Sequence, residues 1–584
     1  MHRRTFLSTA LLSPLLVQHS LGANSEHRLP DSDSHRKMVS SFVEDNPVPE
    51  YHWASESAYE AFRDMKYGIR VHWGIYSVAG FLHESWPFLN LSFKERARYN
   101  DLYKTWDPSG FDADEWTSFF AENGMRMFAF TTKHHEGFSM FDTKTRVRQR
   151  IRWDAPGRPQ IEDCNLAYSI METPFRRDVV KELCDAGRKR GLRIALYFSH
   201  PDWYDSDFRP YADDPVTVPS AAQLDPGWKG SIKRNGGRLV MTPDPTPEQV
   251  ARMMTRHRAQ LTELLTRYGD IQMLSLDQWL GPAVWPQLRQ TILELRKLQP
   301  NVMMRARGIG NYGDYYTPEG FVPGQKSNTD MPWMVIYPLA RGFSFDPDGS
   351  QYKGAAWIIR NIVDTAAKGG SFQVGIGPDA NGKFHPTAIA QVKEVGAWLR
   401  TCGEGIYATR PRAGDHWSEG DNLRFTRSKD GKTVYCFALA WPGASLRVRS
   451  LRPQEGSPIL MFGYPEPMKW SFDSGNGLSI KLPEALQDRK PTEYAWGWSI
   501  TAKCAVKNFP DQERKQDRSF WERELNLAPR VGFEPTTLRL TAECSTVELP
   551  RSKTLSIAGE SRLRFPAKWA RTIKTHARRR MSNL

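Results

Sequence analysis

Residues 177–200 read RDVVKELCDAGRKRGLRIALYFSH, a helical pattern followed directly by an almost uninterrupted apolar run. The same unit recurs between about residues 50 and 400, where apolar runs alternate with amphipathic helical patterns such as 246–269. The other runs are YGIRVHW (67–73), MFAFTTKHH (127–135), IQMLSLD (271–277), NVMMRAR (301–307) and SFQVGIG (371–377). Strands that helices cover on a parallel sheet have this continuous apolar character. We therefore predict an α/β fold in which strands and helices alternate around a parallel sheet.

The carboxyl ends of these runs carry polar side chains, namely His72, His134, His135, Tyr197, His200, Asp277 and Arg307. A (β/α)8 barrel brings the carboxyl ends of its strands to one mouth, where active sites are built. An open doubly wound sheet is the alternative, but it favours a glycine-rich phosphate turn after its first strand. The sequence contains neither GxGxxG nor GxxxxGK. We predict a (β/α)8-like barrel over residues 50–400, preceded by a linker over 24–49.

The pattern changes after about residue 400. Short alternating segments follow, separated by Gly, Pro, Asp and Ser; they are LRFTRS, TVYCFALAW, SLRVRSL, PILMFGY and GLSIKLP. Such segments are typical of an antiparallel β-sandwich, which we predict over 401–501. Residues 502–584 have no sustained periodicity, and we expect a disordered tail or a spurious extension of the reading frame.

The net charge of +14 is concentrated at the two ends of the chain. Residues 505–584 hold 17 Lys and Arg against nine Asp and Glu, which accounts for +8, and Arg3 and Arg4 add +2. The remaining charge is too weak and diffuse for a polyanion-binding surface, so we expect no nucleic-acid partner. The six cysteines are scattered without a CxxC pair, which indicates neither a zinc site nor a disulfide framework.

The first 23 residues, MHRRTFLSTALLSPLLVQHSLGA, have the order of a signal peptide: a basic pair, an apolar stretch and small residues. Arg3 and Arg4 followed by ThrPheLeu resemble a twin-arginine signal. A membrane anchor is the weaker alternative, because the apolar stretch is short and contains Pro14. We expect a periplasmic or secreted protein with no membrane span in the mature chain.

Two carboxylates are candidates for glycoside chemistry. Asp277 follows a buried strand, and Glu319 follows in GDYYTPE after the next strand and its Arg307. Retaining glycosidases use one ionised carboxylate to attack and one protonated carboxyl to donate, about 5 to 5.5 Å apart. For Asp277 alone, a helix cap or a loop salt bridge is the plain alternative.

Histidines and tryptophans provide a set suited to a sugar. Neutral imidazole both donates and accepts hydrogen bonds, and indole faces suit the C–H face of a pyranose. The candidates are His72, His134, His135, Glu84, Trp73, Trp86 and Trp203. The tryptophans could equally be core residues, and a metal hydrolase built on the histidines and Asp277 is a further alternative. His134 and His135 would point to opposite sides if the strand continued through them, which argues against a bidentate metal pair.

Six segments, in order, resemble the α-L-fucosidases of glycoside hydrolase family 29: KYGIRVHWGIYSVAG, FAFTTKHHEGFSMFDTKTR, YFSHPDWY, DYYTPE, IVDTAAKGGSFQVGIGPDANG and GEGIYATRP. The resemblance covers about residues 50 to 500. It implies a (β/α)8-like catalytic barrel, a C-terminal β-sandwich, no metal or other cofactor, and hydrolysis of a fucosylated glycan with retention of configuration through a covalent fucosyl enzyme.

The resemblance also implies roles for individual residues. Asp277 corresponds to the nucleophile and Glu319 to the acid/base. The positions that match sugar contacts are His72, Glu84, Trp86, His134, His135, Tyr197 and Arg307. The chain departs from the family pattern at Arg70, Ser275, Arg305 and Met334, where the family usually has a hydrophobe, Trp, Asn and Glu. These departures permit a different sugar, such as galactose or a substituted fucose, or a weakened enzyme. Ser275, Arg305 and Met334 also motivate the alternative of a non-catalytic or weakly active carbohydrate-binding protein on the same scaffold.

Overall fold

The computed structural model describes residues 27–33, 35–156, 159–208, 230–233, 238–241, 246–318, 329–414 and 416–502. The chain divides into two compact units, Met1–Pro529 and Arg530–Leu584, and every described residue belongs to the first. The predicted signal peptide (1–23), Glu319, and the predicted tail beyond its first residue lie outside the described residues.

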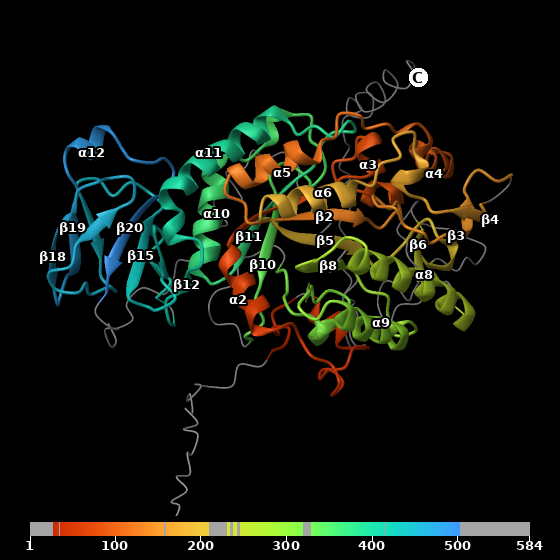
Figure 1. Ribbon diagram of the computed structural model, residues 1–584, viewed down its shortest axis with the longest axis horizontal. Coiled ribbons are helices and arrows are strands. Elements are labelled where there is room, and N and C mark those ends of the chain that lie inside the picture. Colours follow the sequence, from red (N-terminus) through yellow and green to blue (C-terminus); the bar gives the residue numbers. More distant parts are fainter. Residues whose placement is uncertain are drawn as a thin grey trace, which may run out of the picture. The chain divides into compact units, whose positions relative to one another are not determined.

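A seven-stranded parallel sheet forms the centre of the larger part of the molecule (Figure 1). Its strands are β1 (Tyr67–Val71), β2 (Met127–Lys133), β5 (Arg193–Ser199), β8 (Met273–Asp277), β9 (Met303–Met304), β10 (Met334–Pro338) and β11 (Ser371–Ile376). Their order is β10-β11-β1-β2-β5-β8-β9, and every neighbouring pair is parallel. The predicted alternation of strands and helices is confirmed.

Helices surround this sheet (Figure 1). They are α2 (Glu56–Met65), α5 (Ala113–Glu122), α6 (Val179–Lys189), α8 (Pro247–Thr266), α9 (Trp285–Leu298), α10 (Ala355–Ala367) and α11 (Pro386–Cys402). Local signals start two of them. The Asp178 side chain accepts from the N–H of Lys181 at the start of α6, and Thr246 forms a capping box with Gln249 at the start of α8.

The sheet closes into a ring through a two-residue segment. Isolated parallel bridges join Arg305 to Tyr315 and Tyr316 to Trp333, so Tyr315 and Tyr316 lie between β9 and β10. This segment takes the place of an eighth strand. It is not a regular strand because each of its residues contributes a single bridge, to a different neighbour. The expected (β/α)8-like barrel is therefore confirmed, with seven regular strands and one vestigial one.

The interior of the barrel changes from apolar to polar along the strands. Alternate residues of a strand face opposite sides. On β8, Leu274 and Leu276 pack in the core beneath the helices, whereas Met273 packs in an interior cluster with Met127, Met303 and Met334. Further along the same interior face of β8 come Ser275 and then Asp277. Polar side chains thus occupy the carboxyl half of the interior, and a methionine cluster fills its amino end.

The C-terminal part consists of antiparallel sheets. One contains β12 (Arg410–Pro411), β13 (Ser418–Glu419), β14 (Leu423–Arg427), β15 (Thr433–Ala438), β17 (Ile459–Met461) and β20 (Trp496–Thr501); the other contains β16 (Ser445–Val448), β18 (Lys469–Asp473) and β19 (Gly477–Lys481). They share a separate apolar core that includes Phe425, Val448 and Trp498. A buried ion pair, Arg424 Nε to Asp364 Oδ1 at 2.7 Å, joins β14 to α10.

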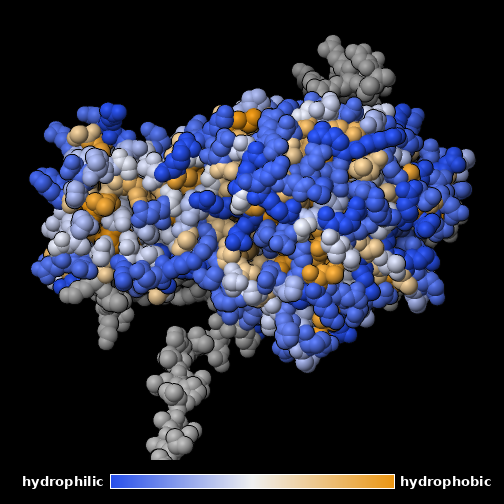
Figure 2. All heavy atoms as spheres, viewed as in Figure 1, coloured by the Kyte–Doolittle hydropathy of each residue, from blue (hydrophilic) through white to orange (hydrophobic). Residues whose placement is uncertain are grey.

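Shorter elements complete the described chain: α1 (Arg36–Val39), α3 (Ile75–Val78), α4 (Phe93–Asn100), α12 (Ala485–Asp488), the hairpins β3 (Val147–Arg152) with β4 (Gln160–Leu166) and β6 (Gly230–Lys233) with β7 (Arg238–Met241), and several 3-10 turns. The face of the molecule drawn in Figure 2 is mainly hydrophilic, with small scattered hydrophobic patches. Within the described ranges, every helix is too short or too polar to cross a bilayer.

Candidate active site

Asp277 lies at the carboxyl end of β8, and its side chain is 12% exposed. Its carboxylate accepts three hydrogen bonds: from the Tyr197 hydroxyl to Oδ2 at 2.8 Å, from Arg307 Nη1 to Oδ1 at 2.9 Å, and from the Gln278 N–H to Oδ1 at 3.0 Å. Arg305 Nη1 lies 3.6 Å from the same Oδ1. The carboxylate is therefore held by side chains on β5 and on the segment that follows β9.

These neighbours keep Asp277 ionised. Burial alone raises the pKa of a carboxyl group, but the positive charges of Arg305 and Arg307 act in the opposite direction. The hydrogen bond from Tyr197 also favours the charged form. The net result is a pKa for Asp277 well below its ordinary value of 3.8. An ionised carboxylate at the mouth of the barrel is the form that a nucleophile requires.

The three predicted sugar-binding histidines lie together around Tyr197. The ring centroids of His72 and His134 are 5.3 and 5.6 Å from that of Tyr197. The rings of His134 and His135 are 4.2 Å apart. Opposite directions for these two adjacent side chains were expected only if the strand continued through them, and this condition is not met because β2 ends at Lys133.

Each imidazole is oriented by a hydroxyl group at its Nδ1 atom: His72 by Thr131 at 3.0 Å, His134 by Ser85 at 2.6 Å, and His135 by Ser199. Burial lowers the pKa of all three histidines, and the pKa of His135 falls to about 4 in spite of the nearby charge of Asp277. The rings are therefore neutral at pH 7. Neutral imidazoles both donate and accept hydrogen bonds, as sugar hydroxyls require.

Glu84 is a buried carboxyl group of the opposite character. Burial raises its pKa to about 8, with a further upward contribution from the charge of Asp277 and an opposing hydrogen bond from the Phe343 N–H to Oε1 at 3.1 Å. Its own N–H donates to Ser344 Oγ at 2.9 Å, and its backbone has a φ of 41°. The loop that follows β10 therefore fixes Glu84, which is mainly protonated at pH 7.

The candidate tryptophans divide into one site residue and two core residues. Trp86 is half-buried, and its ring lies 4.7 Å from that of His135 and 5.5 Å from that of Trp203. Trp203 is only 1% exposed. Trp73 is fully buried and donates from Nε1 to the Asp379 carbonyl. Trp86 is thus the one of these three with an indole face accessible beside the histidines.

Two departures from the family pattern contact each other beneath the site. Arg70 Nη2 donates to Ser275 Oγ at 2.7 Å, and its Nε donates to Gln373 Oε1 at 3.4 Å. The guanidinium also lies 5.2 Å from the ring centroid of Tyr197. Burial, followed by the charge of Arg305, lowers the pKa of Arg70 to about 10, so it stays charged at neutral pH. The hydroxyl of Ser275 thereby satisfies a buried cation.

Arg305 is the site residue that sequence reasoning missed, because it was considered only as a departure. A signal was present: in RAR, Arg305 and Arg307 are two residues apart in an extended segment, which places both on one face. Arg305 Nε also donates to Thr317 Oγ1 at 2.7 Å. This contact ties Arg305 to the segment that precedes Glu319 in sequence.

The other half of the predicted catalytic pair is not placed. Glu319 lies outside the described residues, so its separation from Asp277 stays a prediction. Met334, at the position where the family usually has a glutamate, lies at the start of β10 and packs in the methionine cluster with Met273 and Met303. The Met334 departure therefore belongs to the apolar amino end of the barrel interior and leaves the surroundings of Asp277 unchanged.

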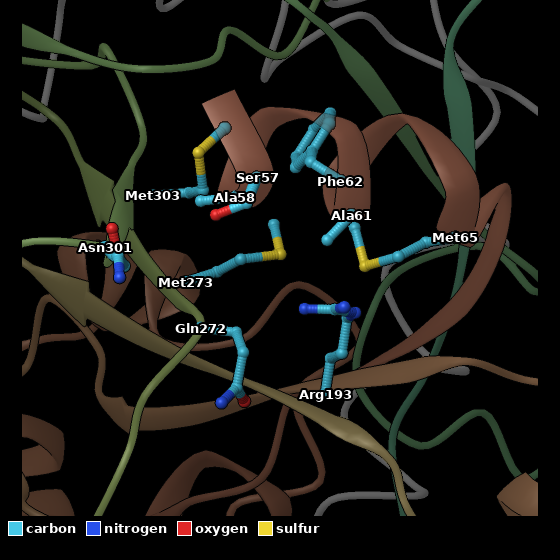
Figure 3. Close-up of a pocket in the computed structure, with 10 residues that line it drawn as sticks. All are labelled: Ser57, Ala58, Ala61, Phe62, Met65, Arg193, Gln272, Met273, Asn301 and Met303. Carbon is cyan, nitrogen blue, oxygen red and sulfur yellow. The ribbon is translucent and has the colours of Figure 1, made fainter. Parts of the chain in front are cut away.

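A cavity of about 210 Å³ lies at the opposite end of the barrel (Figure 3). It is lined by α2 and by the amino ends of β5, β8 and β9, with Phe62, Met65, Met273 and Met303 facing it. Active sites of such barrels lie at the carboxyl ends of the strands, and this cavity lacks a cluster of titratable groups. We assign it to imperfect packing. Among the described residues, no three His, Cys, Asp or Glu side chains form a metal-binding group.

Comparison with known proteins identifies the family of the chain. The alpha-L-fucosidase family model matches residues 40–404, and the model of the alpha-L-fucosidase C-terminal domain matches residues 418–501. The tissue alpha-L-fucosidase of Homo sapiens is 26% identical over 466 residues, which cover 75% of this chain and 88% of that protein. The plasma alpha-L-fucosidase of Homo sapiens is 24% identical over 464 residues, covering 75% and 89%.

Solved structures share the fold. Alpha-L-fucosidase isoenzyme 1 from Paenibacillus thiaminolyticus superimposes with a TM-score of 0.60 at 22% identity, covering 77% of this chain and 99% of that one. An alpha-L-fucosidase GH29 from Bacteroides thetaiotaomicron, trapped as a covalent intermediate with 2-fluoro-fucosyl fluoride, gives 0.59 at 21% identity, covering 78% and 100%. Because the family model covers more than half of its length, the chain belongs to the alpha-L-fucosidase family and is a glycosidase.

Proposed function

We propose that this protein is an exo-acting, retaining α-L-fucosidase that releases terminal L-fucose, or a close analogue, from glycans. The observation that carries the proposal is the environment of Asp277: a buried carboxylate kept ionised by two arginines and a tyrosine, next to three neutral histidines. The covalent intermediate trapped in the Bacteroides thetaiotaomicron enzyme supports a double displacement for the family fold.

In the first step, Asp277 attacks the anomeric carbon and the bond from that carbon to the leaving oxygen breaks. Glu319 gives its proton to the leaving oxygen, which departs as a neutral alcohol. Tyr197 and Arg307, which donate to Asp277, hold the attacking oxygen in place. Their hydrogen bonds weaken as the carboxylate becomes an ester, so they also favour its later departure.

In the second step, Glu319 takes a proton from water, and the resulting oxygen attacks the anomeric carbon to displace Asp277. Two inversions restore the original configuration. His72, His134 and His135 are positioned to donate to and accept from sugar hydroxyls, and protonated Glu84 can do the same. The half-buried face of Trp86 suits the C–H face of the sugar.

We also propose that residues 1–23 direct export by the twin-arginine route, so that the enzyme acts in the periplasm or outside the cell. We propose further that residues 50–400 form the catalytic barrel and residues 401–501 the accompanying β-sandwich. The expected substrate is a fucosylated glycan or oligosaccharide. Export is tested by fractionating cells that express the full chain and the variant in which Arg3 and Arg4 are replaced by Lys; retention of only the variant in the cytoplasm supports the proposal.

A weakly active carbohydrate-binding protein on the same scaffold is the second candidate, favoured by the second arginine beside Asp277. A carboxylate that two cations stabilise is a weaker nucleophile, and Arg305 lies only 3.6 Å from Oδ1. Hydrolysis of an aryl α-L-fucoside decides between the two candidates. Release of the aryl group, with the α anomer of fucose appearing first by NMR, supports the enzyme. Binding of fucose with only very slow turnover of an activated aryl fucoside supports the binding protein.

The same assay on aryl galactosides, arabinosides and xylosides defines the sugar. Asp277→Asn is the matched variant, because it keeps the shape of the side chain and removes the charge. If the enzyme proposal is right, this variant binds the sugar and no longer hydrolyses the glycoside.

A further inference from the structure

Residues 29–33 and His35 pack against the active site although they precede the residues that the family model matches. The family model begins at residue 40. A very small cavity of about 10 Å³ separates this segment from the barrel, and its lining includes Asp33 and His35 on one side and Arg307 and Thr317 on the other. Asp33 and His35 are 6% and 4% exposed. The segment is therefore packed tightly onto Arg307, a donor to Asp277.

Several contacts fix this segment on the barrel. The N–H of Leu29 donates to Asn311 Oδ1 at 2.9 Å, and the Leu29 carbonyl accepts from Arg36 Nη1 at 2.8 Å. The N–H of His35 donates to Asp33 Oδ1 at 2.8 Å, which shapes the turn before α1. A Cβ atom added to Gly310 would lie 3.0 Å from the Val43 side chain, so the chain after α1 also lies close to the loop that follows Arg307.

His35 lies close to the loop that follows Asp277 and to the segment that carries Arg307. Its ring centroid is 6.1 Å from that of Trp279, two residues after Asp277. Arg307 lines the same small cavity as His35. Burial lowers the pKa of His35 to about 3, and the charge of Arg307 contributes in the same direction, so the ring is neutral at working pH. A neutral ring at this position fills space beside the guanidinium without adding a competing charge.

The Asp33 carboxylate is the second anion near Arg307. Burial and the charge of Arg305 lower the pKa of Arg307 to about 10, whereas Asp277 and, more weakly, Asp33 raise it. Asp33 therefore offsets part of the repulsion between the two arginines. Because a buried guanidinium is held by its neighbours, removal of packing on one side changes where its hydrogen bonds point.

We propose that residues 29–33 and His35 are part of the active site, and that His35 is a positioning residue that holds Arg307 in its hydrogen bond with Asp277. The inference rests on the proposed function of the site and adds to it a segment that lies before the residues that the family model matches. It predicts that a chain with an altered N-terminal segment keeps its barrel and loses much of its activity.

The test is a double-mutant cycle in the full chain with p-nitrophenyl α-L-fucoside. The variants are His35→Ala, Arg307→Lys and the two combined, with His52→Ala as control, because His52 is exposed and outside the site. We expect His35→Ala to lower kcat/KM by about 10-fold, the effect of weakening one hydrogen bond to a charged group. We expect it to lower kcat/KM by less than about 2-fold when Arg307 is already Lys, since two residues that act as a unit are not additive.

A structural role alone gives a different result. Equal losses in both backgrounds, or a lower Tm with unchanged kcat/KM per folded molecule, overturn the inference. If His35→Ala does not fold, His35→Gln, which keeps a neutral polar side chain, is used in the same cycle. If the wild type does not hydrolyse the fucoside, the proposed function fails. The Kd of a fucose-configured iminosugar then replaces kcat/KM in the cycle, and absence of binding by the wild type overturns both proposals.

Discussion

Replacing Arg305 by glutamine should move the acidic limb of the pH profile. Arg305 Nη1 is 3.6 Å from Asp277 Oδ1, and the two side chains are 5% and 12% exposed. At this separation, two unit charges interact by about 5 kcal/mol at an effective dielectric constant of about 20. That energy corresponds to about 3 pKa units as an upper limit. A nearby arginine typically lowers a carboxyl pKa by about 1 to 3 units, so we expect a rise of that size when Arg305 is neutralised.

The sign of the change follows from the role of Asp277. The nucleophile acts in its ionised form, so activity is lost as pH falls through its pKa. In the wild type this pKa lies well below 3.8, because the charges of Arg305 and Arg307 outweigh the effect of burial. We therefore expect wild-type kcat/KM to persist down to about pH 4. In Arg305→Gln the loss should begin at least about 1 unit higher.

The assay is kcat/KM for an aryl α-L-fucoside from about pH 2 to 8, so that the wild-type limb is included, with folding followed by circular dichroism at each pH. Arg148→Gln is the matched control, because Arg148 is an exposed arginine on β3. An acidic limb that stays in place in folded Arg305→Gln would refute the electrostatic argument. A limb that moves equally in the control would show that net charge, and not the contact with Asp277, is responsible.

Three further predictions concern the same barrel. Asp277→Gly should lower kcat by about 10⁴-fold or more. Added azide should restore part of the turnover and give a fucosyl azide as product. If no small anion restores turnover, the role of Asp277 as nucleophile is contradicted. Glu84, with a pKa of about 8 against an ordinary 4.5, holds a proton in the folded state that the unfolded chain releases. The stability that this group contributes is fully present below pH 4.5 and is lost progressively as the pH rises to about 8. The Tm of Glu84→Gln relative to the wild type should therefore increase between pH 4.5 and about 8 and stay constant above that. A Tm difference that does not change with pH would count against a raised pKa for Glu84. Arg70→Met and Ser275→Ala should each lower the free energy of unfolding. In a double-mutant cycle the two changes should show a coupling of about 1.5 to 3 kcal/mol, because the 2.7 Å hydrogen bond between Arg70 and Ser275 involves a buried charge. Additive losses would mean that this contact contributes nothing.

Local sequence pattern was sufficient for the barrel and for part of its site. A buried parallel strand is mainly apolar on both faces, and its polar residues gather toward its carboxyl end, so the runs that lead to Asp277, His72 and Tyr197 could be identified directly. Helix starts were equally local, as the capping box at Thr246 illustrates. The eighth strand could not be recognised, because two residues with one bridge each have no periodicity.

Contacts between segments distant in sequence needed the folded chain. Arg70 and Ser275 are two departures 205 residues apart, and only the closed barrel brings the guanidinium to the hydroxyl. The approach of His135 to His134 depended on where β2 ends, which is set by its pairing with β5. Chemistry-bearing residues can be read from a strand and its end, because burial acts on each strand separately. The charge state of Asp277 depends on side chains that only the folded chain brings together, and so does the packing of His35 on Arg307. Coulomb and contact energies depend on distance in space, which the sequence by itself does not give.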